Sequence, residues 1–260
     1  MLLIHPGILF VLCCLQAKAM DLWQWALSIG LVALAAFVRG LSGFGSAMIL
    51  TPGLSLLYNP QQVVAIVILL EMVASAGLLP KAIAQTKWAE VLPMAIAAVI
   101  MVPLGAFCLS LLDPELMRRT IAGLILVFVL LLTTGTHYSG QPHIAIHFGV
   151  GALSGFLTGM TGMGGPPVVL YQLSGDDTAA ESRANFISFL ALTQVVGHAS
   201  YGASGLLSGW VLQRFFVFLP VSLLSLVLGQ LLFATVSESL FRKLVMGLLV
   251  SIAFLALWLT

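Results

Sequence analysis

The chain has 260 residues, of which 60% are hydrophobic and 7% charged, and its formal net charge is +1 at pH 7. A soluble domain carries roughly a quarter charged residues, so this composition excludes an ordinary water-soluble protein and predicts an outer surface that faces lipid. The near-zero net charge also argues against nucleic acid as a partner, because such surfaces need a strong positive field.

The N-terminal segment stands apart from the rest. Residues 8–15 are apolar, and Ala17, Lys18 and Ala19 form a small-x-small pattern just before Met20. Such a pattern is typical of a cleaved signal, although no basic region precedes it. Residues 1–19 are therefore either a signal-like segment or an extension ahead of a start at Met20, and we leave them out of the predicted fold.

Apolar runs near the length of about 20 residues that a membrane helix needs follow one another along the chain. They lack the alternation of a barrel strand, so they predict helices. The sequence therefore predicts an all-α polytopic membrane protein with about eight transmembrane helices, at residues 22–38, 62–79, 91–112, 120–134, 143–157, 185–201, 211–236 and 240–257.

Two apolar stretches are too rich in glycine and proline to be continuous helices. One covers residues 40–53 and the other residues 159–167. Glycine and proline disfavour the helix interior, yet the flanking residues are too apolar for an aqueous loop. Both stretches are predicted to be broken or re-entrant helices at membrane depth.

Matched residues recur in order along the two halves of the chain. The matches predict a tandem duplication, with one four-helix repeat in residues 20–135, a second in residues 143–260, and a broken segment in each. The pairs, at offsets of 119 to 124, are Gly40 with Gly159, Ser42 with Thr161, Gly43 with Gly162, Gly45 with Gly164, Glu71 with Gln194, Trp88 with Trp210, Gly105 with Gly229 and Gly123 with Gly247.

The paired breaks are the best candidates for a binding site. A broken helix in lipid persists where it lines a polar cavity, and paired breaks point to a transporter's midplane site. Half-helix N-termini suit an anion. The alternative is that the glycines only allow close helix packing. The predicted substrate-binding backbone and hydroxyl groups belong to Ser42, Gly43, Gly45, Ser46, Thr161, Gly162, Gly164 and Gly165.

The two glycine-rich segments resemble those of a known family. The segments RGLSGFGS, residues 39–46, and GFLTGMTGMGGPP, residues 155–167, are similar to those of the sulfite exporter TauE/SafE family, and the resemblance extends over nearly all of residues 20–260. It implies a multi-pass transporter of the bacterial inner membrane for small anions such as sulfite, sulfonates and related organic acids. It does not specify which anion.

Charged residues inside the spans are functional hypotheses by default. Glu71 lies in the middle of an apolar run. It is either a protonatable coupling group or a structural residue that joins two helices. Arg39 adjoins the first glycine cluster and either clamps the anion or extends to the membrane interface.

Gln194 and His198 are four residues apart and share a helix face. They either bind a substrate oxyanion or hydrogen-bond neighbouring helices.

The sequence as a whole therefore predicts a secondary transporter for a small anion, driven by protons through Glu71.

Two other classes of function fit parts of the sequence. A passive anion channel could use the same breaks. An intramembrane serine protease could use Ser42 and His198, but Ser42 matches Thr161 in the other half and a dyad needs only one copy. We expect no enzyme activity, no cofactor and no metal, since the three cysteines have no metal-binding spacing. A homodimer is compatible with the sequence but not specified by it.

Overall fold

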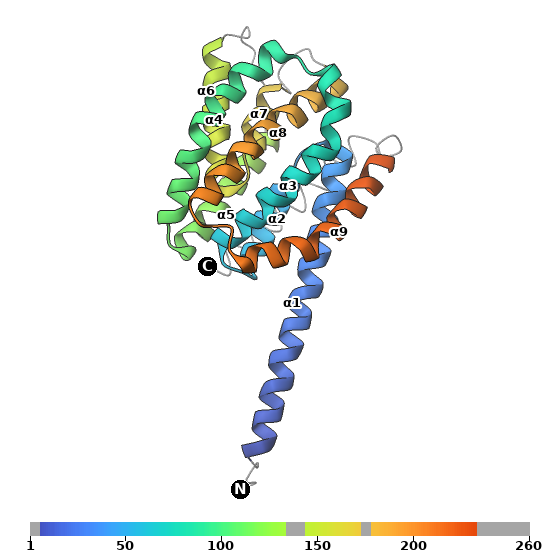
Figure 1. Cartoon of the computed structure of the whole chain (residues 1–260), viewed down its shortest axis with the longest axis vertical. Coiled ribbons are helices and arrows are strands. Elements are labelled where there is room, and N and C mark those ends of the chain that lie inside the picture. The colour runs from blue at the N-terminus through green and yellow to red at the C-terminus, as the bar shows by residue number, and fades with distance from the viewer. Residues whose placement is uncertain (1–5, 134–143, 173–177, 233–260) are drawn as a thin grey trace.

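The computed structural model describes residues 6–133, 144–172 and 178–232, with side chains from Leu22 onward. Every regular element in these ranges is a helix, as the predicted all-α class requires (Figure 1). In chain order the elements are α1 (Pro6–Ser42), α2 (Ser46–Ser55), α3 (Pro60–Ala82), the short 3₁₀ helix η1 (Ile83–Gln85), α4 (Trp88–Leu111), α5 (Pro114–Thr133), α6 (Ile144–Thr161), α7 (Gly165–Gln172), α8 (Ala179–Ala203) and α9 (Gly209–Leu232).

Helix starts follow ordinary capping chemistry. The side chain of Asn59 accepts a hydrogen bond from the Gln61 amide, and Pro60 occupies the first turn of α3. Thr178 and Glu181 form a reciprocal capping box at the start of α8. The hydrogen bonds that Thr178 donates to the Glu181 carboxylate lower the pKa of that exposed group. Local sequence alone therefore sets these boundaries.

Five helices are long and apolar enough to cross a membrane, and each coincides with a predicted span. They are Leu22–Ser42, Pro60–Gln85, Trp88–Leu111, Ile144–Thr161 and Gly209–Leu232. The predicted spans 120–134 and 185–201 fall on α5 and α8, which are helical but not among the five. The predicted span 240–257 lies outside the described residues, so the total of eight stays a prediction.

Helix α1 is longer than the span predicted within it. It runs without interruption from Pro6 to Ser42, and its N-terminal part extends away from the helix bundle (Figure 1). The structure shows no break in helix α1 at the boundary predicted after residue 19. The assignment of residues 1–19 as a signal-like segment or an extension stays a prediction.

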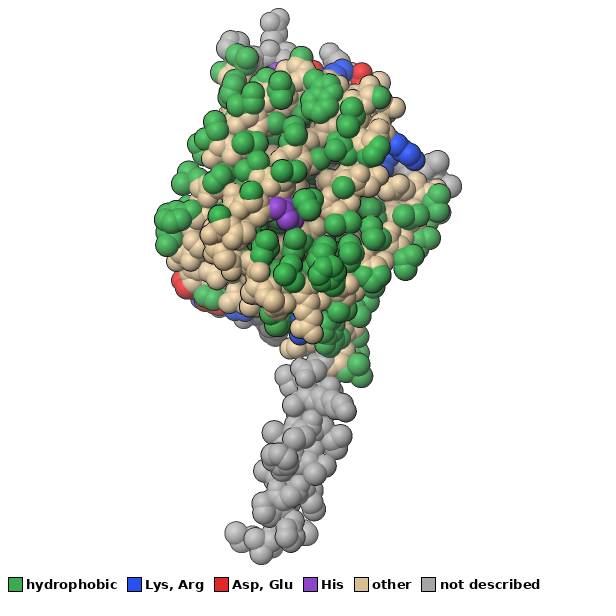
Figure 2. Space-filling model, viewed as in Figure 1, with side chains coloured by type: hydrophobic (Ala, Val, Ile, Leu, Met, Phe, Trp, Pro, Cys, Tyr) green, Lys and Arg blue, Asp and Glu red, His purple; other side chains and the backbone are tan. Residues whose placement is uncertain are grey.

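Large apolar side chains cover the outside of the bundle (Figure 2). Ile100 and Phe107 on α4 and Phe216 on α9 are examples, each more than half exposed. Charged side chains lie near the two ends of the bundle in this view. Soluble monomers rarely expose so much contiguous apolar surface, so the sides of this bundle are built to contact hydrocarbon.

Helices α4 and α6 touch backbone to backbone through glycine. A Cβ atom placed on Gly159 would lie 2.0 Å from the carbonyl oxygen of Val102, and one on Gly105 would lie 2.1 Å from that of Phe156. Small residues let membrane helices approach this closely, which maximises van der Waals contact in a solvent that gives no hydrophobic drive. At these positions glycine serves helix packing.

Helices α1 and α9 make the same kind of contact. A Cβ atom placed on Gly40 would lie 2.3 Å from the carbonyl oxygen of Leu226, and one on Gly229 would lie 2.3 Å from that of Phe37. Each of these two contacts joins a helix of the first half of the chain to a helix of the second half. The halves are therefore interleaved in one bundle.

Helices α3 and α8 run antiparallel through the bundle. The position of a Cβ on Gly197 lies 3.1 Å from the Cδ1 of Ile68, whereas the hydroxyls of Thr86, just beyond α3, and Ser188 are 2.7 Å apart. Later residues of α8 therefore lie beside earlier residues of α3, which means that the two helices run in opposite directions. This pairing places Glu71 and its predicted counterpart Gln194 near the same level of the two helices.

Candidate functional site

The chain breaks between α1 and α2 at glycines in the left-handed region. Gly43 has a φ of 81° and Gly45 a φ of 93°, conformations that only glycine adopts without strain. The Gly43 amide donates to the carbonyl oxygen of Arg39 at 2.8 Å, and the Phe44 amide donates to the Ser42 hydroxyl at 3.3 Å. These bonds satisfy backbone groups that the break leaves without helical partners.

The break between α6 and α7 repeats this local geometry. Gly162 has a φ of 74°, and its amide donates to the carbonyl oxygen of Thr158 at 2.9 Å. The Met163 amide donates to the Thr161 hydroxyl at 3.2 Å. The side chain of Thr51 on α2 donates to the carbonyl oxygen of Thr161 at 3.1 Å, so the two breaks also contact each other.

A buried ion pair lies beside the first break. The guanidinium of Arg39, near the end of α1, is 2.7 Å from the carboxylate of Glu71 on α3, and the two side chains are 1% and 4% exposed. Arg39 also donates to the Ser75 hydroxyl at 2.6 Å, and the Ser46 hydroxyl donates to Glu71. The Arg39 side chain is therefore directed into the bundle rather than onto its surface.

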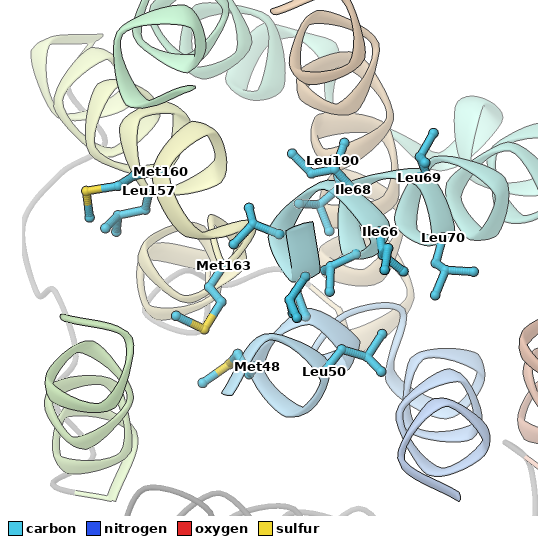
Figure 3. Packing of buried hydrophobic residues seen from close by; sticks show 14 of the residues in the cluster. Met48, Leu50, Ile66, Ile68, Leu69, Leu70, Leu157, Met160, Met163 and Leu190 are labelled. Carbon is cyan, nitrogen blue, oxygen red and sulfur yellow. The ribbon is translucent and has the colours of Figure 1, made fainter. Parts of the chain in front are cut away.

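The two breaks and the ion pair surround one small cavity. Its lining consists of Arg39, Phe44, Gly45, Ala47, Met48, Glu71, Gly162, Met163, Gly165, Pro166 and Leu190. Met48 on α2 and Met163 in the second break approach each other across this region (Figure 3). The space open to the centre of a water molecule is about 20 Å³, which is enough for roughly one water.

The first turns of α2 and α7 both contribute to the cavity lining, α2 through Ala47 and Met48 and α7 through Gly165 and Pro166. A helix N-terminus carries a partial positive charge and unpaired amides, both of which favour an anion. No side chain caps the N-terminus of α2, because Gly45 is its N-cap. In α7 the prolines remove amide donors, so α7 contributes mainly its dipole.

The model of one protein family matches most of the chain. The sulfite exporter TauE/SafE model covers residues 28–256, a range that includes both breaks and the ion pair. The chain belongs to the sulfite exporter TauE/SafE family. Together with the five helices that are long and apolar enough to cross a membrane, this membership supports membrane transport as the general function. Neither the curated proteins nor the solved structures contain a match to this TauE/SafE chain.

The structure brings some of the predicted site residues of this TauE/SafE protein together at the cavity. Arg39, Gly45, Glu71, Gly162 and Gly165 line it. The remaining predicted residues of the two glycine segments lie close by in the breaks: Ser46 bonds to Glu71, Ser42 and Thr161 bond to backbone amides, and Gly43 has a positive φ.

Gly164 has a packing role that the sequence did not reveal. A Cβ placed there would lie 1.8 Å from the Thr158 hydroxyl and 2.5 Å from the carbonyl oxygen of Ser154. The adjacent Gly165 has open space at its Cβ position and lines the cavity. Within one glycine pair, therefore, the first residue allows the chain to turn back against α6 and the second faces the site.

Gln194 and His198 are not among the residues that line the cavity. His198 Nδ1 lies 2.7 Å from the backbone carbonyl oxygen of Gln194. The Gln194 side-chain oxygen is buried and has no hydrogen-bond partner among the described residues. One turn of α8 separates Gln194 from Leu190, which does line the cavity. The predicted oxyanion role of this pair stays a prediction.

Several residues at the site escaped sequence reasoning. Ser75 lies one turn after Glu71 on the same face of α3, so its spacing was the available signal. Phe44, Met48 and Met163 line the cavity as apolar residues in an apolar chain, and nothing in the sequence distinguishes them. Arg183 on α8 donates to the Gly40 carbonyl oxygen at 2.9 Å and so supports the end of α1.

The protease hypothesis needs a contact that the structure does not contain. The Ser42 hydroxyl donates to the carbonyl oxygens of Val38 and Phe44 at 2.9 and 2.6 Å. His198 bonds to the backbone of its own helix. The two described side chains share no hydrogen bond, so they do not form a nucleophile–base dyad here.

Proposed function

We propose that this TauE/SafE protein is a proton-coupled secondary transporter that carries a small anion across the bacterial inner membrane. The anion is sulfite, a sulfonate or a related organic acid. The observation that carries the proposal is the buried Arg39–Glu71 pair at the cavity between the two breaks.

Three features of the cavity favour an anion. Arg39 is the positively charged side chain of the lining, and its charge becomes available to an anion when Glu71 takes up a proton. The N-termini of α2 and α7 supply partial positive charge. The uncapped first turn of α2 offers backbone amides to oxyanion oxygens. Phe44, Met48, Met163 and Leu190 complete the lining and keep the dielectric constant low, which strengthens each of these attractions.

Glu71 is the candidate coupling group because, among the residues that the structure describes, Arg39 is the one ion-pair partner of its carboxylate. Removing two charges from water costs several kcal/mol per ion, and helix–helix attachment in a membrane needs no such pair. A carboxylate retained at this depth is therefore well suited to take up and release a proton. The cavity holds roughly one water, so a larger anion requires the breaks to move, as carriers do.

Uptake into proteoliposomes tests the proposal. Labelled sulfite and a panel of small sulfonates and carboxylates are offered with and without an imposed pH gradient. We expect at least one anion to accumulate with wild-type protein, and only with the gradient. Glu71→Gln should lose this gradient-driven accumulation. Glu115→Gln, which makes the same chemical change in an exposed ion pair on α5, is the control and should behave as wild type.

The other outcomes assign different functions. Flux that ignores both the gradient and the Glu71 substitution would show a passive anion channel and leave Glu71 as a structural residue. Absence of flux for every anion would contradict the transport proposal, while the membrane fold and family membership would stand.

A further inference from the structure

The charge balance of the cavity is unusually simple. Arg39 and Glu71 are the charged residues in its lining, and they neutralise each other. Helix α2, which packs between them and the second break, has no charged residue at all. Apart from helix dipoles, the site in this state therefore carries a formal charge of zero.

The other charged groups on helices packed against α3 are engaged elsewhere. On α8, Arg183 donates to the Gly40 carbonyl, His198 bonds to its own helix and Glu181 pairs with Lys87. On α9, Arg214 stacks on the Trp25 ring, 3.8 Å from its centroid. On α5, Arg118 donates to the Ser55 carbonyl, and Glu115 pairs with Arg119. Within the described residues, Arg39 is thus the one charged partner of Glu71.

The Arg39 guanidinium cannot pair with the Glu71 carboxylate and with a substrate anion at the same time. Its Nη1 bonds to the carboxylate and its Nη2 to Ser75, while its Nε is buried and has no hydrogen-bond partner in the part of the chain that the structure describes. The carboxylate of Glu71 therefore occupies the position that an oxyanion would take on the guanidinium. The Ser46 hydroxyl, at the first residue of α2, likewise points to Glu71.

On the basis of the proposed function, we infer that Glu71 competes with the substrate anion for Arg39. When Glu71 takes up one proton, the anion displaces it from Arg39. The protein therefore moves one proton with one monoanion and no net charge. The proton comes from the side on which the anion enters and binds to the Glu71 carboxylate. The anion then pairs with Arg39. Both are released on the other side, and the Arg39–Glu71 pair forms again.

The neutral sum follows from the cost of burying charge. The empty site contains Arg39⁺ and Glu71⁻, and the loaded site contains Arg39⁺, a neutral Glu71 and a monoanion, so both states sum to zero. A dianion would leave one buried charge without a partner, at a cost of several kcal/mol. The site is therefore selective for monoanions such as hydrogen sulfite or an alkyl sulfonate over sulfate and other dianions.

The small volume of the cavity supports displacement over simple addition. With about 20 Å³ open to water centres, an oxyanion does not fit beside the ion pair. Once neutral, the Glu71 side chain loses its attraction to Arg39 and can turn away, which frees both space and donors. Proton uptake and anion binding thus require each other, and this mutual requirement is what couples the two fluxes.

Membrane potential provides the test in wild-type protein. Proteoliposomes with labelled sulfite or ethanesulfonate, a fixed inward pH gradient and a potassium-set potential are compared at 0 and 100 mV of either sign. We expect steady-state accumulation to change less than about two-fold. A carrier moving one net charge would change it roughly fifty-fold per 100 mV, and that result would overturn the inference while leaving proton-coupled transport intact.

Glu71→Gln separates exchange from net flux. The variant keeps Arg39 but lacks the competing carboxylate, so the charge of Arg39 is neutralised only when an anion is bound. We expect exchange of labelled for unlabelled ethanesulfonate to persist and net gradient-driven uptake to fall at least ten-fold. Glu71→Asp, which can still take up a proton, should restore part of the net uptake, and Glu115→Gln should leave both activities unchanged.

Three outcomes contradict the inference in distinguishable ways. Net uptake by Glu71→Gln equal to wild type would show that Glu71 does not compete for Arg39. Sulfate competing with ethanesulfonate as strongly as sulfite does would remove the selectivity for monoanions. Absence of uptake of both labelled anions by wild-type protein would overturn the proposed function and, with it, this mechanism.

Discussion

At the scale of single residues, the buried Arg39–Glu71 pair is a feature that costs folding free energy. Two charges with side chains 1% and 4% exposed lose nearly all their hydration, and their mutual attraction offsets that loss only if both remain. Ser75 and Ser46 add hydrogen bonds to each partner. Packing alone would be served as well by two apolar side chains, which is a physical reason to assign the pair a function.

Removing one partner of this pair should destabilise the protein far more than removing both. We expect Arg39→Met to lower the free energy of unfolding by about 3–5 kcal/mol, because Glu71 is left buried without a counter-charge. The double variant Arg39→Met/Glu71→Met should lie within about 1 kcal/mol of wild type or above it. Unfolding in mixed micelles by SDS titration measures both. A double variant as unstable as Arg39→Met would show that the pair is not the source of the effect.

At the scale of helices, glycine has two different roles in this chain. Gly43, Gly45 and Gly162 permit the breaks through positive φ angles. Gly105 and Gly159 permit the close contact of α4 with α6. Close packing is thus a separate role of glycine in this chain, and at the α4–α6 contact it holds in position the helix that leads into the second break.

A single methyl group at the α4–α6 contact should therefore be poorly tolerated. Gly159→Ala places a Cβ 2.0 Å from the Val102 carbonyl oxygen, so the backbones must move apart, at a cost of about 1–3 kcal/mol. Gly149→Ala on the same helix meets nothing within 4 Å and should be neutral or slightly stabilising. Thermal unfolding in detergent compares the two, and equal midpoints would contradict the close contact.

At the scale of the whole molecule, the surface is inverted relative to a soluble protein. Apolar side chains cover the sides of the bundle (Figure 2), whereas the buried polar residues Asn185, Ser188 and Thr193 face inward from α8. The surrounding lipid dictates this arrangement, because an unsatisfied polar group in hydrocarbon costs several kcal/mol.

The depth of a residue in the bilayer should therefore control its response to charge. Ile100 at the middle of α4 and Leu111 at its end are 65% and 69% exposed. We expect Ile100→Arg to oppose membrane insertion by about 2.5–3.5 kcal/mol, and Leu111→Arg by far less because its side chain reaches the interface. Glycosylation mapping of insertion measures both, and equal insertion would contradict a span centred near Ile100.

Much of the fold was predictable because it depends on local sequence. Apolar composition predicts membrane helices, since lipid is the one common solvent that accepts such a surface. Clusters of glycine and proline predict breaks at both places where the structure has them, because these residues oppose the helix by their own covalent geometry. The five spans and both breaks therefore lie where the sequence indicated.

The site itself depended on the tertiary structure. Arg39 and Glu71 were each candidates, but on different helices, and only the return of α3 past the first break brings their charges to 2.7 Å. The meeting of two breaks from opposite halves of the chain at one cavity likewise depends on how α1 packs on α9 and α4 on α6. Sequence alone determined which segments enter the membrane and where they break, because these are properties of single segments. Which charges face each other was decided by packing between segments far apart in the chain, which no local pattern encodes.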